Sequence, residues 1–303
     1  MKKTFAIPAL LLAAALFTGC GGNDDSDVPS EIIVDNSGMV EPDSSVFPVK
    51  LADGTVIEHA PESAVSLSPA ATEIISELGF GEKLCAVSRY CDYPENVCSV
   101  TAGSSENPDI DKLTELSPDV LFTLTPLAER EKYALESSGI TVVELSAPET
   151  AEEYGELYGV VAAVFSGGEA GNAAAANAVQ SLKDSAKDVK LGTFVYVTPK
   201  LTAAGSDTFE NAVLSLCGTN LCTAEGYTSF SDDIPEAPEY IIASDELKVS
   251  DITGSELFSG IAQDAEIIFV PSARFERPSA RISEVYAAIR SALAGAPQTA
   301  EAE

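Results

Sequence analysis

Short apolar runs alternate with stretches of helical spacing along most of the chain. Residues 64–67 are an apolar run that stops at Ser68-Pro69, and residues 70–78 then place apolar side chains at helical spacing before Gly79. Strands that alternate with helices predict a parallel sheet covered on both faces. The same rhythm predicts strands at 84–88, 119–123, 141–145, 193–197, 240–243 and 266–270, and helices at 109–116, 129–138, 207–216 with Asp207 as its cap, and 279–293.

Two segments depart from this rhythm. Residues 46–58 alternate around Asp53-Gly54, a turn pair typical of a β-hairpin. Residues 150–187 lack strand patterning and are rich in Ala, Glu, Leu and Lys. A break at Ser166-Gly167-Gly168 divides this second segment, so we expect two consecutive helices there, the second from about residue 169.

The pattern as a whole predicts an α/β protein with two Rossmann-like lobes joined by a long backbone helix. We expect an N-terminal lobe at 46–148, a helical connector at 149–189 and a C-terminal lobe at 190–296, followed by a disordered tail at 297–303. Ligands of open α/β sheets bind beyond the carboxyl ends of the strands. Two facing lobes therefore predict a ligand cleft between them.

The first 20 residues have the organisation of a lipoprotein signal peptide. Two lysines precede an apolar run at 6–17, and Thr18-Gly19-Cys20 follows it. That run is shorter than the ~20 residues that a membrane-spanning helix needs. We expect residues 1–19 to be removed and Cys20 to carry a lipid that anchors an exported protein to the cell membrane; an ordinary secretory signal is the alternative. Residues 20–45 are acidic and aperiodic, and we expect a disordered tether.

The charge balance limits the partners. Of 303 residues, 48 are acidic and 17 are Lys or Arg, which gives a formal net charge of −31. Binding of nucleic acid requires a basic surface, so we expect no nucleic acid partner. Such a charge keeps a protein soluble and monomeric, and we expect a monomer. No later stretch of the sequence is long and apolar enough to suggest a second membrane segment.

Six cysteines raise the question of disulfides or zinc. If Cys20 carries the lipid, five remain, and an odd number leaves at least one thiol unpaired within the chain. Export permits disulfides, and the local pairs are Cys91 with Cys98 and Cys217 with Cys222; the pairing stays open at this point. The spacing of Cys85, Cys91 and Cys98 is not the Cys-x2-4-Cys spacing of structural zinc, so zinc is disfavoured.

The motifs of common enzyme classes are missing from the sequence. It has no Gly-x-Ser-x-Gly elbow, no His-Glu-x-x-His and no phosphate-binding Gly-x-x-x-x-Gly-Lys. The one histidine, His59, falls in the predicted hairpin, so we expect neither a Ser-His-Asp triad nor a bare transition-metal site. The sequence therefore predicts a protein that is not an enzyme and has no resident cofactor.

Several runs, in order along the chain, resemble one family. VSLSPAATEI at 65–74, VSRYCDYP at 87–94, LTELSPDV at 113–120 and RFERPSARI at 274–282 are similar to the class III periplasmic binding proteins, which serve ABC importers of cobalamin, haem and iron-siderophore complexes. The second and fourth runs resemble the cobalamin-binding branch most closely. LTAAG at 201–205, followed by Thr208-Phe209, is similar to the start of the second lobe. The resemblance covers about residues 46–295.

This resemblance implies a rigid clamp, tethered near a permease, that captures a vitamin B12-type corrinoid and passes it on unchanged. Tyr90 matches the family position whose ring lies against the corrin, and Arg277 matches one that reaches the ligand from the other lobe. Aromatic faces and a few directed donors suit a broad apolar ring with amide arms. The expected ligand contacts are Ser68, Arg89, Tyr90, Tyr227, Phe230, Arg274, Phe275 and Arg277.

Departures from the family pattern keep other ligands open. The chain has no Trp, whereas cobalamin-binding relatives often use indole platforms, and Ala273 replaces an aspartate four residues before Arg277. The alternatives are a corrinoid precursor, a ferric siderophore, haem, or a surface lipoprotein without a transport role. Because His59 falls outside the expected cleft, haem iron would depend on tyrosine. Phe275 is as consistent with core packing as with ligand contact.

The resemblance also implies a docking carboxylate on each lobe, opposite Arg pairs on the permease. Asp111 stands at the position in the first lobe, where the family usually has glutamate. In the second lobe the corresponding helix is short, and Asp233 and Glu236, with Asp232 beside them, are the candidates. The alternative is that these carboxylates have no docking role, because the surface is so acidic that any single carboxylate is usually only hydrated.

Overall fold

The computed structural model describes residues 46–295; Cys20, the signal peptide, the acidic tether and the expected tail lie outside this range. Its first element is an antiparallel hairpin of β1 (Val49–Lys50) and β2 (Val56–Ile57), and Gly54 in the turn has φ +94°. Glycine adopts a positive φ without steric cost, which explains the Asp53-Gly54 turn. The predicted hairpin is confirmed, with shorter strands than expected.

The N-terminal sheet is parallel, as the sequence predicts. Its side chains alternate between two apolar clusters: Val120 and Phe122 face α1, whereas Leu121 faces α2 and α3. Helices therefore cover both faces, which agrees with the mainly apolar sequence of its strands. The strand order is β4-β3-β7-β8, with β3 Ala64–Ser66, β4 Leu84–Val87, β7 Val120–Thr123 and β8 Thr141–Glu144, and the helices are α1 Pro69–Glu77, α2 Ile110–Leu116 and α3 Glu129–Ser137.

The C-terminal sheet is mixed rather than wholly parallel. Its strands β9 (Thr193–Val197), β13 (Tyr240–Ser244) and β14 (Glu266–Val270) are parallel and were predicted from the sequence. The sheet continues through β10 (Ala203–Ala204) and β12 (Tyr227–Thr228), which pair antiparallel. The sequence did not predict these strands because two residues show no readable alternation. The order is β12-β10-β9-β13-β14, and β11 (Thr219–Asn220) pairs with β9.

Two predicted helix starts in the C-terminal half need correction. Asp207 was expected to cap α6 (Phe209–Leu214), but the cap is Thr208, whose Oγ1 accepts a hydrogen bond from Asn211 N at 3.2 Å. The closing helix was expected from residue 279 and instead begins with the 3-10 turn η4 (Ala280–Ile282) before α9 (Ser283–Leu293). The remaining elements are α7 Val249–Thr253, α8 Ala273–Glu276, η2 Gly81–Lys83 and η3 Ser231–Asp233.

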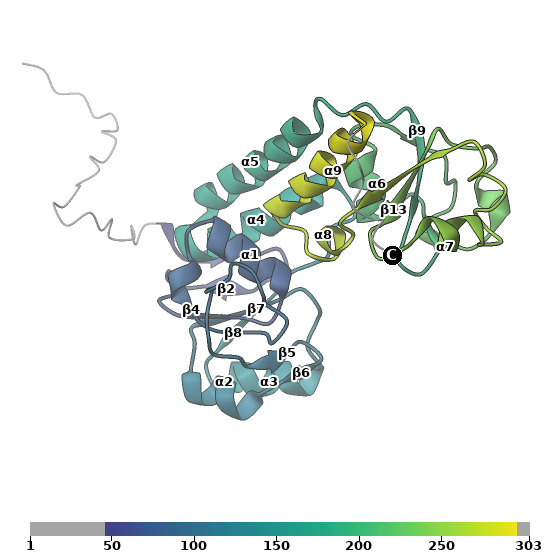
Figure 1. Cartoon of the computed structure of the whole chain (residues 1–303). Helices are drawn as coiled ribbons and strands as arrows, with labels where there is room; N and C mark the ends of the chain where they lie inside the picture. Colours follow the sequence, from purple (N-terminus) through teal and green to yellow (C-terminus); the bar gives the residue numbers. More distant parts are fainter. Residues whose placement is uncertain (1–45, 296–303) are drawn as a thin grey trace, which may run out of the picture. The chain divides into compact units, whose positions relative to one another are not determined.

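Two consecutive helices, α4 (Ala151–Ser166) and α5 (Gly168–Ala186), connect the sheets, as predicted. They run alongside each other, and α9 lies next to α5 (Figure 1). The two backbones approach closely because small residues face each other: a Cβ on Gly171 would lie 2.7 Å from the carbonyl oxygen of Gly159.

The apolar core runs through this connector without a break. Val161 of α4 and Leu182 of α5 belong to the same buried cluster as Phe122 of the first sheet and Tyr196 of the second. A shared core resists relative movement of the two lobes, because movement would expose apolar surface. The predicted fold class is thus confirmed, while the exact lobe boundaries stay predictions. Within residues 46–295, no helix combines the length and the apolar character needed to cross a membrane.

Candidate functional site

A pocket of about 330 Å³ lies between the two lobes. The ends of β3, β4 and β7 form one wall, and the end of α8 with Arg277 forms the other. The pocket therefore lies at the carboxyl ends of the strands, where the sequence predicts the cleft. Three of the expected ligand contacts line it: Ser68, Tyr90 and Arg277.

Local structure fixes the first two of these side chains. Ser68 ends β3 and caps α1, with its Oγ accepting a hydrogen bond from Ala71 N at 3.3 Å. Tyr90 follows β4, and its backbone N donates to the Oγ of Ser88 at 3.3 Å. The Tyr90 side chain is 54% exposed, so its ring presents an open face. The guanidinium of Arg89 lies 5.0 Å from the centre of that ring, within the range of a cation–π contact.

Arg277 reaches across from the other lobe. Its guanidinium forms an ion pair with Asp92, and its Nη2 donates to the carbonyl oxygen of Tyr90 at 3.4 Å. The structure therefore brings together Tyr90 and Arg277, the two residues on which the predicted ligand site depends. Asp92 is a participant that sequence reasoning did not single out.

Other expected ligand contacts have different surroundings. Arg274 donates through Nε to Glu284 of α9 at 2.7 Å, so its charge is already paired. Phe275 is 7% exposed, and its ring packs 5.1 Å from that of Tyr196, which favours the core-packing interpretation. Arg89, Tyr227 and Phe230 are exposed but do not line the pocket. Contact of these three with a larger ligand stays a prediction.

Sequence reasoning missed a buried hydroxyl in the pocket wall. Ser104 belongs to a small antiparallel ladder, β5 (Gly103–Ser104) with β6 (Asn107–Pro108). Its side chain is 2% exposed, and its Oγ has no hydrogen-bond partner within residues 46–295. The neighbouring Ser105, by contrast, donates to the carbonyl oxygen of Leu67 at 3.2 Å. A buried hydroxyl without a partner is unusual and calls for a ligand or a water.

The pocket also carries carboxylates on both walls. Glu276 at the end of α8 and Glu106 in the β5–β6 turn are exposed and line it from opposite sides. The hydroxyl of Tyr227 donates to the carboxylate of Glu210, whose Oε1 and Oε2 lie 3.0 and 2.9 Å from it. Loss of hydration raises the pKa of Glu210, and the nearby charge of Glu276 raises it further.

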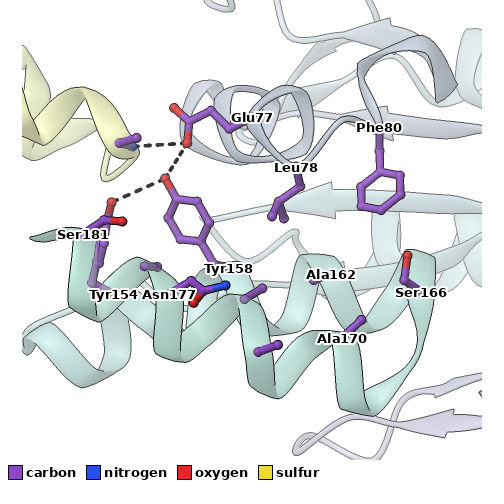
Figure 2. Close-up of a pocket in the computed structure, with 14 residues that line it drawn as sticks. Glu77, Leu78, Phe80, Tyr154, Tyr158, Ala162, Ser166, Ala170, Asn177 and Ser181 are labelled. Carbon is purple, nitrogen blue, oxygen red and sulfur yellow. Dashed lines mark hydrogen bonds between the residues drawn. The ribbon is translucent and has the colours of Figure 1, made fainter. Parts of the chain in front are cut away.

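A second pocket, of about 480 Å³, lies between α1, α4 and α5 (Figure 2). The hydroxyl of Tyr158 and the backbone N of Ala280 both donate to Glu77 Oε2, at 2.5 and 3.2 Å, and the Tyr154 hydroxyl donates to that of Tyr158 at 3.4 Å. Loss of hydration raises the pKa of Glu77. Because these polar groups already bond one another, we interpret them as a structural connection between the lobes rather than as a ligand site.

One turn earlier on α1, a second glutamate makes the same connection. Glu73 is 1% exposed and accepts hydrogen bonds from Ser279 Oγ at 2.6 Å and Arg281 Nη1 at 3.3 Å. The guanidinium of Arg281 also lies 4.2 Å from the ring centre of Tyr93. One face of α1 thus holds the segment 279–281 of the other lobe, which limits how far the cleft can open.

The expected docking carboxylates differ in availability. Asp111 is exposed in the first turn of α2, and Glu236 is exposed after η3. Asp233 is partly buried, and its Oδ2 accepts a hydrogen bond from Thr228 Oγ1 at 2.5 Å. Asp111 and Glu236 are therefore the better placed of the three to meet a partner.

All five cysteines of residues 46–295 are free thiols. The local disulfides considered from the sequence are absent from this part of the chain. Cys91 Sγ lies 3.1 Å from Thr72 Oγ1. Cys217 donates to the carbonyl oxygen of Leu214, and burial raises the pKa of its thiol to about 12. Cys222 packs into a different apolar cluster, which separates it from Cys217.

His59 lies at the other end of the first sheet. It interacts with the carboxylate of Asp119, which precedes β7 and accepts hydrogen bonds from the backbone N of Glu62 and of Ser63 at 2.8 and 2.9 Å. The carboxyl end of the same strand faces the pocket. The prediction that the histidine falls outside the cleft is therefore confirmed.

Comparison with known proteins identifies the family. The profile of the periplasmic binding proteins matches residues 65–270, which is more than half of the chain. The chain belongs to the periplasmic binding protein family. Proteins of this family bind small ligands for ABC importers, pair with a permease and catalyse no reaction. This periplasmic binding protein is accordingly a substrate-binding protein and not an enzyme, as the sequence predicts.

Two curated relatives are similar in sequence. The ABC transporter substrate-binding lipoprotein YvrC of Bacillus subtilis is 28% identical over 289 residues, which cover 86% of this chain and 87% of the relative. A vitamin B12-binding protein of Vibrio cholerae is 29% identical over 165 residues, which cover 52% of this chain and 59% of that protein.

Solved structures of the same fold bind different ligands. The periplasmic vitamin B12 binding protein BtuF of Vibrio cholerae is 21% identical, with a TM-score of 0.56, and the match covers 78% of this chain and 99% of BtuF. The periplasmic heme binding protein HutB of the same organism is 18% identical, with a TM-score of 0.63 and coverage of 78% and 99%. These likenesses support the two-lobe fold and leave the ligand open.

Proposed function

We propose that this protein captures a vitamin B12-type corrinoid in the cleft and delivers it to the permease of an ABC importer. The observation that carries the proposal is the meeting of Tyr90 and Arg277, from different lobes, at one pocket. The exposed ring of Tyr90 offers a flat apolar face, and the guanidinium of Arg277 offers donors for amide oxygens. The vitamin B12-binding relative of Vibrio cholerae supports this choice of ligand.

The size of the pocket defines how such a ligand would lie. A volume of about 330 Å³ is at the lower end of the range for small-molecule sites, about 300–1,000 Å³. A corrinoid with its amide arms is larger, so the pocket encloses one part of it. The rest extends over exposed rings near the cleft mouth, for which Tyr90 and Tyr93 are the candidates in the first lobe.

Delivery requires a place at the membrane and a docking surface. We propose that a lipid on Cys20 anchors the protein, which the name of the lipoprotein YvrC supports. Asp111 and Glu236, exposed on different lobes, are the proposed contacts with the permease. One exposed carboxylate on each lobe would be complementary to a basic permease surface.

A titration against four ligands tests the proposal. The purified protein is mixed with cyanocobalamin, cobinamide, haemin and a ferric catecholate, and the melting temperature and ligand absorbance are recorded. We expect the melting temperature to rise with both corrinoids, because a ligand that binds only the folded state stabilises it. A response to the iron chelate without a response to either corrinoid would contradict the proposed ligand.

Haem is the second candidate, because the phenol of Tyr90 is exposed in the pocket and tyrosine is an axial ligand of haem iron. The same titration distinguishes it. Binding of haemin with a shifted absorbance band that is lost in Tyr90→Phe, and no binding of corrinoids, would identify a haem carrier. Binding of both cyanocobalamin and cobinamide by wild-type protein, and loss of this binding in Arg277→Ala, would identify a corrinoid carrier.

A further inference from the structure

Two carboxylates that line the pocket have no ion-pair partner within residues 46–295. Glu106 and Glu276 face the same pocket from different lobes. Among the ion pairs found within residues 46–295, none includes either of these carboxylates. Each lobe therefore presents one carboxylate to the pocket, Glu106 from the first and Glu276 from the second.

The positive charge in the pocket is already engaged. Arg277 is the cation among the described residues that line the pocket, and it forms an ion pair with Asp92. The opposite charges of Arg277 and Asp92 offset each other, whereas Glu106 and Glu276 form no ion pair within residues 46–295. An anionic ligand is repelled in this field, and a cationic one is attracted, more strongly the less water remains in the pocket.

The unpartnered hydroxyl of Ser104 adds a second, independent requirement. Ser104 lines the pocket, and its buried Oγ has no hydrogen-bond partner within residues 46–295. A ligand that brings an amide group to this point would supply the missing partner and restore the hydrogen bond. The pocket therefore fits a ligand that carries hydrogen-bonding groups and no negative charge.

We infer that the cleft selects among corrinoids by charge: Glu106 and Glu276 favour cationic and neutral corrinoids and exclude anionic ones, and Ser104 hydrogen-bonds an amide arm of the bound ligand. This inference rests on the proposed function and specifies the ligand for the same site. It assigns a specificity role to three residues, Ser104, Glu106 and Glu276, that the sequence did not single out.

A charge series at nearly constant size tests the selection. Aquacobalamin is cationic, cyanocobalamin is neutral, and a cyanocobalamin derivative with one amide hydrolysed to carboxylate is anionic. Calorimetric titration of the purified protein should give dissociation constants that rise in this order, with about a tenfold difference between the ends of the series at low salt. High salt should narrow the difference, because it screens exposed charges.

Two variants and a matched control assign the effect to the pocket. In Glu276→Gln, and likewise in Glu106→Gln, the difference between cationic and anionic corrinoids should shrink by about threefold. Glu115→Gln removes the same charge from an exposed position of α2 and should leave the series unchanged. The inference would be overturned if both pocket variants kept the wild-type dissociation constants for the three corrinoids. It would also be overturned if the wild-type dissociation constants did not follow the charge of the ligand.

Ser104 has its own measurement. Ser104→Ala should weaken binding of all three corrinoids by about fivefold without lowering the melting temperature, because the lost partner belongs to the ligand. Ser138→Ala, at an exposed position after α3, is the control. Wild-type affinity in Ser104→Ala would refute the contact. If no corrinoid binds wild-type protein, the proposed function fails; if all bind equally, only the charge selection fails.

Discussion

Arg277 and Asp92, 185 residues apart in the sequence, form an ion pair across the mouth of the cleft. The guanidinium of Arg277, which is expected to bind the ligand, thus already binds a carboxylate of the opposite lobe. Side-chain exposure is 24% for Arg277 and 69% for Asp92, so the pair is partly hydrated and a ligand can compete for it. The carboxylate of Asp92 acts as a substitute acceptor that the ligand must displace.

Removal of this acceptor should strengthen binding of a neutral corrinoid. In Asp92→Asn the guanidinium of Arg277 is free before the ligand arrives, and we expect the dissociation constant for cyanocobalamin to fall about threefold. The free energy of unfolding should change by less than about 1 kcal/mol, because the pair is partly exposed. Calorimetry and urea unfolding measure the two effects. Weaker binding by Asp92→Asn would show that Asp92 contacts the ligand itself.

The pair of Glu73 and Arg281 should contribute much more to stability. Arg281→Met leaves the carboxylate of Glu73 buried with Ser279 as its remaining partner, and we expect a loss of about 2 kcal/mol in urea unfolding. The double variant with Glu73→Gln should recover part of this loss. Glu284→Gln, which removes the more exposed carboxylate that Arg281 shares with Arg274, should cost less than about 1 kcal/mol. Equal losses in Arg281→Met and Glu284→Gln would contradict the account.

Two glycines of α5 should respond in opposite directions to alanine. Gly171→Ala places a Cβ 2.7 Å from the carbonyl oxygen of Gly159 and 2.8 Å from Ala163 Cβ, so α4 and α5 must separate at a cost of about 1–3 kcal/mol. Gly168→Ala meets no atom within 4 Å and should stabilise the protein by up to about 1 kcal/mol, because alanine is the better helix former. Thermal unfolding of both variants tests the close helix contact, which a stable Gly171→Ala protein would refute.

The buried carboxyl of Glu210 should make stability depend on pH. Its pKa in the folded protein is raised above the ordinary 4.5, first by loss of hydration, so the folded state favours the protonated form. The contribution of protonated Glu210 to the free energy of unfolding is fully present below pH 4.5. It is lost as the pH rises through the raised pKa of the folded protein. Glu210→Gln stays neutral and still accepts from Tyr227, so its stability relative to wild type should increase with pH above 4.5.

Urea unfolding of both proteins at several pH values measures this difference. Glu115→Gln, at an exposed position, should keep the wild-type pH dependence. If the free energy of unfolding depends on pH in the same way in wild type and in Glu210→Gln, the pKa of Glu210 is not raised by folding and this account is wrong.

Most of the fold was predictable because buried parallel strands and their covering helices leave strong periodic patterns. The strands β3, β7, β9, β13 and β14 and the helix pair α4–α5 were all found in this way. The cap of α6 was misplaced by one residue because Asp207 and Thr208 are both good caps. Asp207 has φ +60°, whereas Thr208 has the extended backbone that a cap needs, and sequence pattern does not distinguish the two.

The site was predictable only where a family resemblance marked it. Tyr90 and Arg277 were found in this way, but four consecutive residues near α8 lie in three different environments. Arg274 faces α9, Phe275 faces the core, and Glu276 and Arg277 face the pocket. A helix of four residues is too short for periodicity to reveal which side chain points where. Ser104 and Asp92 gain their roles from contacts with segments far away in the sequence, which no local pattern records.

The most direct test of the account is a calorimetric titration of the purified protein with cyanocobalamin, repeated for Tyr90→Ala and Arg277→Ala. The account predicts one corrinoid per protein in the wild type, and at least about tenfold weaker binding when either the ring or the guanidinium is removed, with folding unchanged because both side chains lie at the surface of the cleft. No heat of binding in the wild type, or wild-type affinity in both variants, would contradict the claim that these two residues form a corrinoid site.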